Sequence, residues 1–344
     1  PSPYDTARLS LGASWYGSMT TVSGIRWGPF IDARHDQYHE SQLDAAGREE
    51  DVSRDLGTAG FNISYPLMRK FSKFTAIIEP VLQYAVSPDA QQDPFLPTED
   101  SQSVDFDDTT LFAVNKSPGF DIYEAGARFN VGLRSELHFV SGLKIAGLVG
   151  RTLRDKPEAQ FLKTITSGGV TYSYDPSGLG NKNSDWLLDG SFDTSKGLYG
   201  YVRLRIDSET TRIAQGEWGL SAFSPRTEAT VRYIFNNTLT TPIVVNGELK
   251  RFGDNYRNIQ LYARHFITKN WGVSARLDRD LITNKFRRST VSAIYRNDCI
   301  WYELIYQRDE TNLYSHNGKP QSSILLRLNF PTLGKSSSEF NDVR

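Results

Sequence analysis

Apolar and polar residues alternate along many short stretches of the chain, and this period of two constrains the fold more than any other feature. One example is LYGYVRLRID, where Val202, Leu204 and Ile206 oppose Arg203 and Arg205. The pattern recurs in EATVRYIF, NIQLYARHF, WGVSARLD and QSSILLRLNF. Successive side chains of a β-strand point to opposite faces, so each stretch predicts a strand with one apolar and one polar face.

The predicted strands follow one another without a Pro-rich or Ser-rich linker, which favours one all-β domain. Tyr (17) and Phe (19) far outnumber Met (2), and glycine reaches 27, a mixture typical of strands and turns. We predict about 17 strands, over 7–16, 20–34, 57–65, 73–87, 123–140, 143–151, 166–174, 184–193, 199–207, 214–223, 228–235, 243–252, 257–267, 270–279, 287–297, 299–308 and 321–330.

Alternation alone is compatible with a soluble β-sandwich and with a transmembrane β-barrel. No run approaches the ~18 consecutive apolar residues of a spanning helix, but barrel strands alternate and do not produce such runs. Two features favour the barrel: strands of ~9–11 residues at hairpin spacing, and aromatic residues near strand ends. These aromatic residues are Trp218, Trp271, Tyr295, Tyr302 and Tyr306.

Connection lengths support the barrel further. If the last strand ends in the periplasm, long outside loops should alternate with short inside turns. The outside connections are then 309–320, 280–286, 253–256, 224–227, 194–198, 152–165, 88–122 and 35–56, and the inside ones are 297–298, 268–269, 236–242, 208–213, 175–183, 141–142, 66–72 and 17–19. The long connections all fall outside, although 175–183 is long for an inside turn and 224–227 is short for an outside loop.

No motif supports catalysis or nucleic-acid binding. The net charge is −1 over 344 residues, which gives no reason to propose a nucleic-acid partner. The histidines are scattered, and we expect His35 and His39 to be surface residues at the base of a loop rather than metal ligands. A barrel enzyme would need a histidine with a serine or acidic partner at the outer rim, for which His35, His138 and His316 are the candidates. We predict no catalytic residues, no metal and no cofactor.

An acidic stretch, PTEDSQSVDFDDTTLF at 97–112, comes closest to a metal-binding or catalytic motif. Asp105, Asp107 and Asp108 suggest a calcium loop, but the alternating ligands, the central glycine and the closing glutamate of an EF-hand are absent. A solvated acidic loop is the favoured interpretation, and loose binding of a hard cation is the alternative.

Charged residues on the polar face of the predicted strands have two interpretations. They could simply solvate the lumen, or the basic ones could contact an anionic ligand through charge-assisted hydrogen bonds. The residues predicted to face the lumen are Arg203, Arg205, Glu217, Arg232, Arg264, Arg276, Glu303 and Arg327.

The region Ile77–Arg134 resembles the C-terminal barrel region of the LPS-assembly protein family LptD, also called the organic solvent tolerance protein family. The family pattern is a strand ending in E-P-x-x-Q, a loop with E-D-S and D-x-(T/S)-x-L-F, an N-(R/K)-x-x-G-x-D segment, and a Gly-rich strand. The matching residues are Glu79, Pro80, Gln83, Glu99, Asp100, Ser101, Asp108, Thr110, Leu111, Phe112, Asn115, Lys116, Gly119, Asp121, Gly126, Arg128 and Gly132.

A second match lies at the end of the chain, where NDCIWYELIYQRD and SSILLRLNFPTLG resemble the last hairpin and the closing strand of the family. The resemblance implies the C-terminal part of a larger antiparallel outer-membrane barrel over 1–334, followed by a tail over 335–344. The early strands and the periplasmic N-terminal domain of the family are then absent from this sequence.

The resemblance implies a Gram-negative outer-membrane translocon that moves lipopolysaccharide through the barrel and out through a lateral gate between the first and last strands. The gate residues would be Ser322, Ile324, Leu326, Leu328 and Phe330. The implied partners are the plug lipoprotein LptE, periplasmic bridge proteins, the barrel assembly machinery and outer-membrane lipid. The family motif loop, with Glu99, Asp100, Ser101, Asp108, Leu111, Phe112 and Asp121, would be a cell-surface or lumen-capping loop.

The resemblance also implies a role for the single cysteine, Cys299. Family members carry cysteine at this position that bridges to the N-terminal domain, so an interdomain disulfide is implied; the alternative is an inert thiol. The alternative function is a general porin or nutrient-uptake channel, which would conduct ions without a lipoprotein plug.

Overall fold

The computed structural model describes residues 5–41, 49–88, 100, 104–311 and 320–330. Seventeen of its strands form one large antiparallel sheet, and two short strands form a separate hairpin. The all-β prediction is therefore confirmed. The predicted tail 335–344 lies outside the described residues, as do Glu99 and Ser101 of the family motif loop.

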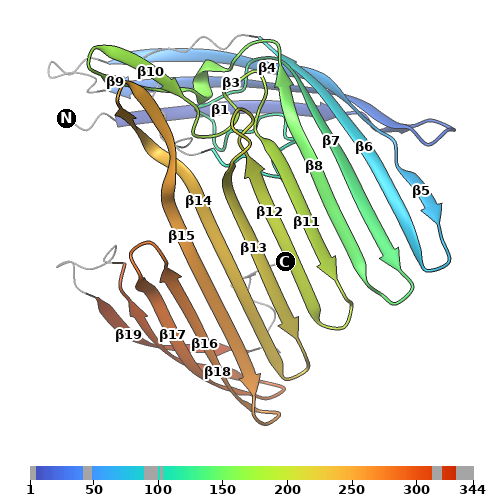
Figure 1. Ribbon diagram of the computed structural model, residues 1–344, viewed down its shortest axis with the longest axis vertical. Helices are drawn as coiled ribbons and strands as arrows, with labels where there is room; N and C mark the ends of the chain where they lie inside the picture. The colour runs from blue at the N-terminus through green and yellow to red at the C-terminus, as the bar shows by residue number, and fades with distance from the viewer. Residues whose placement is uncertain (1–4, 42–48, 89–99, 101–103, 312–319, 331–344) are drawn as a thin grey trace. The chain divides into compact units, whose positions relative to one another are not determined.

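The chain divides into two compact units, and Figure 1 labels their strands. Unit 1 comprises 1–190, 203–215 and 238–253, and unit 2 comprises 191–202, 216–237 and 254–344. Unit 1 contains β1 (Asp5–Tyr16), β2 (Met19–Thr20), β3 (Arg26–Ser41), β4 (Glu50–Ser64), β5 (Leu67–Lys70), β6 (Phe74–Ser87), β7 (Gly126–Phe139), β8 (Lys144–Arg154), the 3-10 turn η1 (Ala159–Phe161), β9 (Lys163–Ser167) and β10 (Val170–Tyr174). Residues of both units occur in β11 (Trp186–Asp193), β12 (Leu198–Ile206), β13 (Ile213–Phe223), β14 (Thr227–Val245) and β15 (Glu248–Phe266). Unit 2 also contains β16 (Trp271–Asp280), β17 (Lys285–Arg296), β18 (Trp301–Asp309) and β19 (Gln321–Asn329).

Two predicted strands are wrong, and both contain a tight turn. The predicted strand 243–252 is the tip of the β14–β15 hairpin, where Asn246 (φ 53°) and Gly247 (φ 78°) are left-handed. The predicted strand 166–174 is the separate β9–β10 hairpin, which turns at Gly168 and Gly169. Asn-Gly and Gly-Gly favour two-residue turns because both positions need positive φ. Alternation continued through the turns and concealed them.

These two errors inverted the side assigned to the connections between them. Turns of an antiparallel sheet alternate between its two strand ends, so 194–197 and 224–226 share an end with 267–270 and 297–300, which we call the short-turn end. Backbone hydrogen bonds within unit 2 agree, from Phe223 N–H to the Gly197 carbonyl (2.6 Å) and from Phe266 N–H to the Arg226 carbonyl (2.8 Å).

The opposite strand ends, the long-loop end, carry 88–125, 155–185, 207–212 and 246–247. In unit 1, the Tyr172 hydroxyl donates to the Gly247 carbonyl (3.2 Å), and the Arg251 guanidinium pairs with Glu209 (2.5 Å). The predicted inside turns 175–183 and 208–213 therefore lie at the long-loop end. This correction removes both exceptions in the predicted alternation.

The apolar face of unit 1 carries two rows of aromatic residues. Phe74 and Phe139 pair near the short-turn end, with ring centroids 5.4 Å apart. The Tyr84 ring, near the long-loop end of β6, contacts the tilted rings of Phe61 (centroids 5.7 Å apart) and Phe129 (4.8 Å). Phe74 and Tyr84 are ten residues apart on β6, or ~33 Å along the strand, which a ~40° tilt reduces to ~25 Å. That is the height of the apolar band of an outer-membrane barrel.

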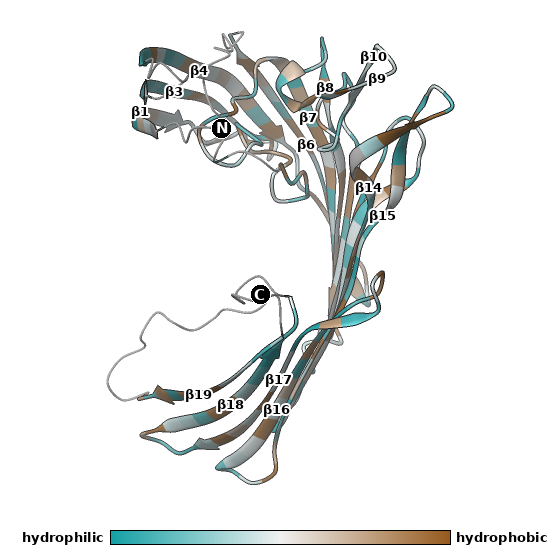
Figure 2. Cartoon of the chain, turned by 90° about the vertical axis from the view of Figure 1, so that its left-hand side faces the viewer, coloured by the Kyte–Doolittle hydropathy of each residue, from teal (hydrophilic) through white to brown (hydrophobic). Residues whose placement is uncertain are grey.

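Unit 2 has a matching aromatic row at its short-turn end. Trp271, Tyr295 and Tyr302 are cross-strand neighbours on β16, β17 and β18, with centroid distances of 4.9 Å and 6.3 Å. Hydrophobic and hydrophilic residues alternate along these strands (Figure 2). We call the face with the aromatic rows the outward face and the opposite one the polar face.

Candidate functional site

The polar face of unit 1 holds a ladder of amide and hydroxyl side chains across four strands. Gln83 donates to the Asn62 side chain (2.9 Å), Asn130 donates to Gln83 (2.5 Å), and Thr152 donates to Asn130 (2.7 Å). Gln83 also donates to the backbone carbonyl of Phe112 (2.9 Å). The ladder therefore satisfies buried polar groups of the sheet and, at the same time, holds a segment of the longest connection.

That segment, residues 104–125, is named here the docked loop. Its Phe106 and Leu111 are fully buried in a cluster with Phe161, Leu179 and Leu187. The expectation of a solvated acidic loop is therefore wrong for these residues. The apolar residues that follow the aspartates drive the loop onto the sheet, because burying them removes apolar surface from water.

Two glycines of the sheet make room for the docked loop. A Cβ on Gly132 of β7 would lie 2.9 Å from the Phe112 ring, and one on Gly150 of β8 would lie 2.5 Å from a Leu111 methyl group. The Leu-Phe pair of the family motif thus packs directly on the backbone of two adjacent strands. In this chain the Leu-Phe pair therefore depends on glycine at Gly132 and Gly150, because a side chain at either position would collide with it.

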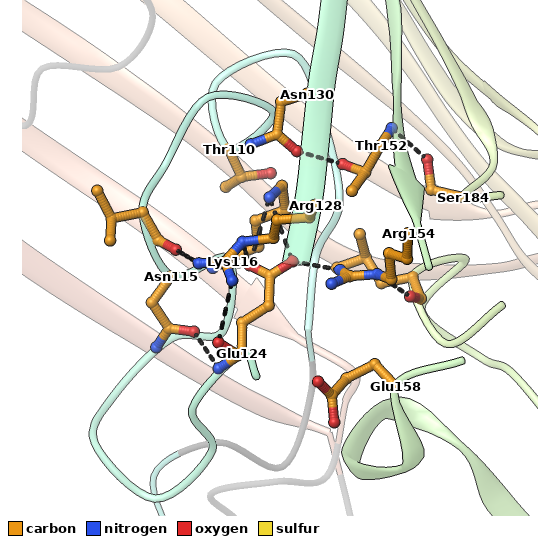
Figure 3. Close-up of polar contacts among 12 residues, drawn as sticks. Thr110, Asn115, Lys116, Glu124, Arg128, Asn130, Thr152, Arg154, Glu158 and Ser184 are labelled. Carbon is orange, nitrogen blue, oxygen red and sulfur yellow. Dashed lines mark hydrogen bonds and ion pairs between the residues drawn. The ribbon is translucent and has the colours of Figure 1, made fainter. Parts of the chain in front are cut away.

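A buried ion cluster holds the other half of the docked loop (Figure 3). Glu124 lies 3.3 Å from the Lys116 ammonium and 3.5 Å from Nε of Arg128, and it accepts a hydrogen bond from Arg154. Arg128 also donates to the Val114 carbonyl (2.5 Å). Lys116 and Glu124 belong to the loop, while Arg128 and Arg154 belong to β7 and β8. One carboxylate therefore joins the loop to two strands.

Charge and burial set the protonation of this cluster. Burial lowers the pKa of Lys116 to about 7. The neighbouring Arg128 and Arg154 also lower this pKa, whereas Glu124 raises it. Burial would raise the pKa of Glu124, but Lys116, Arg128 and Arg154 outweigh it and hold the value at about 2. Glu124 is thus ionised at neutral pH and is the anion on which the cluster depends.

A second ionic contact fixes the loop to β1 and β4. Arg8 pairs with Asp100 (2.9 Å) and Asp121 (2.7 Å). Arg54 donates to the backbone carbonyls of Phe120 (2.7 Å) and Asp121 (2.8 Å). Two motif aspartates are therefore engaged by a strand arginine.

Two further aspartates of the acidic stretch, Asp107 and Asp108, interact with other residues of the protein. Asp107 accepts hydrogen bonds from the N–H groups of Thr109 (2.9 Å) and Thr110 (3.1 Å) and so caps a turn. Asp108 lies 3.4 Å from Nε of Arg203. Within the part of the chain that the structure describes, no group of three or more potential ligands could hold a metal ion.

Arg205 differs from its predicted role as a lumen-facing residue. Its side chain is 3% exposed, pairs with Asp185 (3.4 Å), and donates to the carbonyls of Ser177 (2.5 Å) and Pro176 (3.1 Å). Burial raises the pKa of Asp185 to about 7, although Arg205 favours its charge. Arg205 fastens the loop 175–185 to β12 and is not available to a solute.

The other predicted lumen residues lie on the polar face, and most are paired with carboxylates. Arg203 lies near Asp108 and Asp189, and the Arg276 guanidinium lies over the Tyr262 ring (5.5 Å). Among the predicted lumen residues of unit 2, Arg232 pairs with Glu217 (2.8 Å), Arg264 with Glu228 (2.6 Å) and Arg327 with Glu303 (3.0 Å). The polar face of unit 2 therefore presents neutralised charge rather than a basic strip.

The predicted gate residues lie on the last strand. β19 pairs with β18, and its alternate residues Ser322, Ile324, Leu326 and Leu328 share the outward face with Tyr306 and Tyr302. Ile324 is 72% and Leu326 64% exposed, although both are large and apolar. Phe330 follows the strand and is also exposed. Within unit 2, β18 is the one described strand that pairs with β19.

Cys299 lies in the 297–300 turn at the short-turn end, where it is exposed and unpaired with another cysteine. Its N–H donates to the Asn297 side chain (3.0 Å). This position agrees with the predicted short turn beside β18.

His35 and His39 lie within β3 and not at the base of a loop as predicted. They face Asp55 (2.7 Å) and Asp51 (2.8 Å) on β4 in cross-strand pairs. The predicted loop 35–56 is largely strand, because polar alternation continues beyond the apolar part of both strands. Both rings are exposed, as expected of surface histidines.

Glu124 and Arg154 were missed as site residues, whereas Gln83, Lys116 and Arg128 appeared only as parts of the family pattern. No local signal distinguishes Glu124, because its three partners are brought to it by the fold. The Gly-rich strand after a long loop is the signal that could have located the docking surface.

Comparison with known proteins gives one family match. Residues 2–271 match the family described as LPS transport system D, LptD. No curated protein matches the chain. A solved structure of the copper transporter OprC is similar at 11% identity and a TM-score of 0.38, covering 88% of this chain and 51% of that one. The chain thus spans about half the length of that structure.

Proposed function

The chain belongs to the LptD family, and from this premise we propose that it forms part of the translocon that places lipopolysaccharide in the outer leaflet. The family is one of non-enzymatic transport proteins of the Gram-negative outer membrane. The family match over 2–271 is the observation that carries the proposal.

The two faces of the sheet suit the two halves of lipopolysaccharide. The outward face has an apolar band between aromatic rows, which suits contact with acyl chains. The polar face has amide, hydroxyl and paired ionic groups, which suit a hydrated sugar chain. The acyl chains would therefore move along the outward face of the sheet, and the sugar head group along its polar face.

Neutralised charges on the polar face favour passage over retention. Arg232 makes two parallel hydrogen bonds to Glu217 (2.9 and 2.8 Å), the geometry of a strong Arg–carboxylate pair. A phosphate group of the substrate must compete with Glu217 for this guanidinium. The phosphate would therefore remain bound to the polar face only briefly, as transport requires.

The docked loop would cap the lumen at the long-loop end. It covers the polar face of β6, β7 and β8 through Leu111, Phe112 and the Glu124 cluster. Motion of the loop would open a path for the head group without changing the sheet, because side chains of the strands hold the loop through ion pairs and through its backbone carbonyls.

β19 would form one side of the lateral gate, with the first barrel strand of the complete protein on the other. A seam that opens must expose backbone polar groups at membrane depth, which is costly unless the pairing is short or weak. The plug lipoprotein LptE and the periplasmic bridge proteins would be partners, and Cys299 would bridge to the N-terminal domain from the short-turn end.

Depletion of the complete protein from growing cells tests the proposal. We expect newly made lipopolysaccharide to stop reaching the cell surface while porins continue to assemble. Unchanged surface lipopolysaccharide, together with ion conductance by the purified protein without LptE, would instead establish the channel function.

A further inference from the structure

We propose that Arg26 and Arg134 bind the phosphate groups of the lipopolysaccharide head group as it enters the lumen from the short-turn end. The two arginines lie beside Glu79 on the polar face of unit 1, and we call these three residues the entry site. The inference rests on the proposed function, since it concerns the path of the transported head group. It adds a place on the sheet where that head group first binds.

Strand register places the three residues of the entry site on one face. Glu79 of β6 and Arg134 of β7 are cross-strand partners. Arg26 of β3 is the partner of Ser64 on β4, which is in turn the partner of Val81 on β6. Val81 and Glu79 are two residues apart and therefore share a face. Three strands thus contribute one charged side chain each to the polar face.

The two guanidinium groups are exposed and make no hydrogen bond within the described part of the chain. Arg26 lies 3.8 Å and Arg134 3.9 Å from the carboxylate oxygens of Glu79, which is beyond hydrogen-bonding distance. The side chains of the arginines are 62% and 48% exposed, and that of Glu79 is 17% exposed. Two cations therefore share one carboxylate, and each keeps its N–H donors for a solute.

Contact with the docked loop holds Arg134 in place. Its guanidinium lies over the Phe112 ring, 5.1 Å from the ring centroid. An aromatic ring positions a guanidinium without using its donors. Phe112 also packs on Gly132, two residues before Arg134 on β7. The entry site therefore adjoins the loop that would cap the lumen, on the side of the short-turn end.

Two lysines extend the positive charge to the short-turn end. Lys70 of β5 and Lys144 of β8 belong to one cross-strand row, in which Thr75 and His138 lie between them. Both lysines are exposed, and neither forms an ion pair with another described residue. Thr75 precedes Glu79 by four residues, or ~13 Å along the strand. An anionic group that passes the lysines would therefore reach the entry site next.

The charges of this part of the polar face favour an anion. Residues 17–26, 64–81 and 132–150 place two carboxylates on it, Glu79 and Glu136, and four cations: Arg26, Lys70, Arg134 and Lys144. Glu136 is engaged by His138 (2.7 Å). Phosphate is a complementary anion, because it accepts paired hydrogen bonds from guanidinium groups. Glu79 competes for the same donors, so a bound phosphate can leave again.

Several phosphates on one head group suit the arrangement better than a free phosphate ion. The lysines and the arginines lie at successive heights of the polar face, so a phosphorylated sugar chain can contact both at the same time. Linked contacts of this kind strengthen binding beyond that of each contact alone. The ligand class is therefore the phosphorylated head group of a glycolipid.

Photocapture from Met68 in the complete protein tests the inference. Met68 is 72% exposed and shares the polar face of β5 with Lys70. Its cross-strand partner Ile77 is two residues from Glu79. We expect a photoreactive residue at position 68 to capture lipopolysaccharide in cells.

Substitutions in the entry site should change the capture yield in opposite directions. The double substitution Arg26→Gln, Arg134→Gln should lower the yield about tenfold, because charge-assisted hydrogen bonds are lost. Glu79→Gln should raise the yield, because it removes the carboxylate that competes with phosphate. Arg69→Gln is the matched control and should leave the yield unchanged, since it removes a cation from the outward face of β5 at the same strand end.

The outcomes separate this inference from the proposed function. No capture at 68, equal capture in the double variant, an equal fall in Arg69→Gln, or capture of phospholipid alone would overturn the inference while capture from position 326 upheld transport. In the purified complete protein, abolition of capture by an equimolar concentration of inorganic phosphate would also overturn it, since the site would then hold a free phosphate ion. No lipopolysaccharide capture at either 68 or 326 would count against transport itself.

The test does not depend on the double variant alone. If that variant does not reach its heat-modifiable folded form, Glu79→Gln decides. A higher yield in Glu79→Gln than in the unsubstituted protein supports the entry site, and an unchanged or lower yield overturns it.

Discussion

Replacing Glu124 with glutamine should release the docked loop from the sheet. The substitution leaves Lys116, Arg128 and Arg154 buried without the carboxylate that they share. Removing one partner of a buried ion network costs about 3–5 kcal/mol, because the remaining charges cannot be hydrated. Hydrogen exchange of the 110–125 amides in the purified complete protein should accelerate strongly, and cells should become permeable to large antibiotics.

Acid should reproduce the effect of the substitution. The folded-state pKa of Glu124, about 2, lies below its ordinary value of 4.5. The stabilisation is therefore fully present above about pH 4.5 and is lost as the pH falls toward 2. Loop exchange, corrected for its intrinsic pH dependence, should be nearly constant between pH 5 and 6, below the pKa of Lys116 of about 7, and should rise below pH 4.5.

Glu136→Gln is the control for both experiments. Glu136 is a half-exposed glutamate of β7 that pairs with His138 near the short-turn end, so its loss should leave the docked loop unchanged. Equal loosening in both variants, or none in Glu124→Gln, would contradict the role of the cluster.

Replacing Leu304 with arginine should prevent much of the protein from folding into the membrane. Leu304 lies on the outward face of β18 between Ala293 and Leu326, in the middle of the apolar band. An arginine on the lipid face at this depth costs about 2–4 kcal/mol. The fraction of protein that shows heat-modifiable migration in outer-membrane extracts measures the effect.

Gln307→Arg, three residues further along β18, is the matched control. Gln307 lies on the polar face beside Thr290 and Ser323, where an arginine remains hydrated. We expect its folded fraction to equal that of the unsubstituted protein. Equal losses in the two variants would mean that the faces are assigned wrongly.

Much of the fold could be predicted because period-two alternation is local. β12, β13, β16 and β18 were located within one or two residues. The failures at Asn246-Gly247 and Gly168-Gly169 have one cause, since alternation continues through a tight turn while the chain reverses. Positive φ at these residues was encoded by residue type and not by hydropathy.

The candidate site was less predictable, because its contacts join residues far apart in sequence. The family pattern located Leu111, Phe112 and Gly132, but only the structure shows that the loop packs on the glycines. Arg205 looked like a lumen residue by alternation, yet the loop 175–185 covers it. Whether a polar-face residue is solvated depends on the loops above it, and no strand pattern contains that information.

Photocapture from β19 is the most direct test of the transport path. Photoreactive residues at Ile324 and Leu326 of the complete protein, which both point outward, should capture lipopolysaccharide or the first barrel strand in living cells. Capture of lipopolysaccharide should require continued supply from the periplasm. Absence of both products from both positions, in protein that is folded and bound to its plug, would contradict the account.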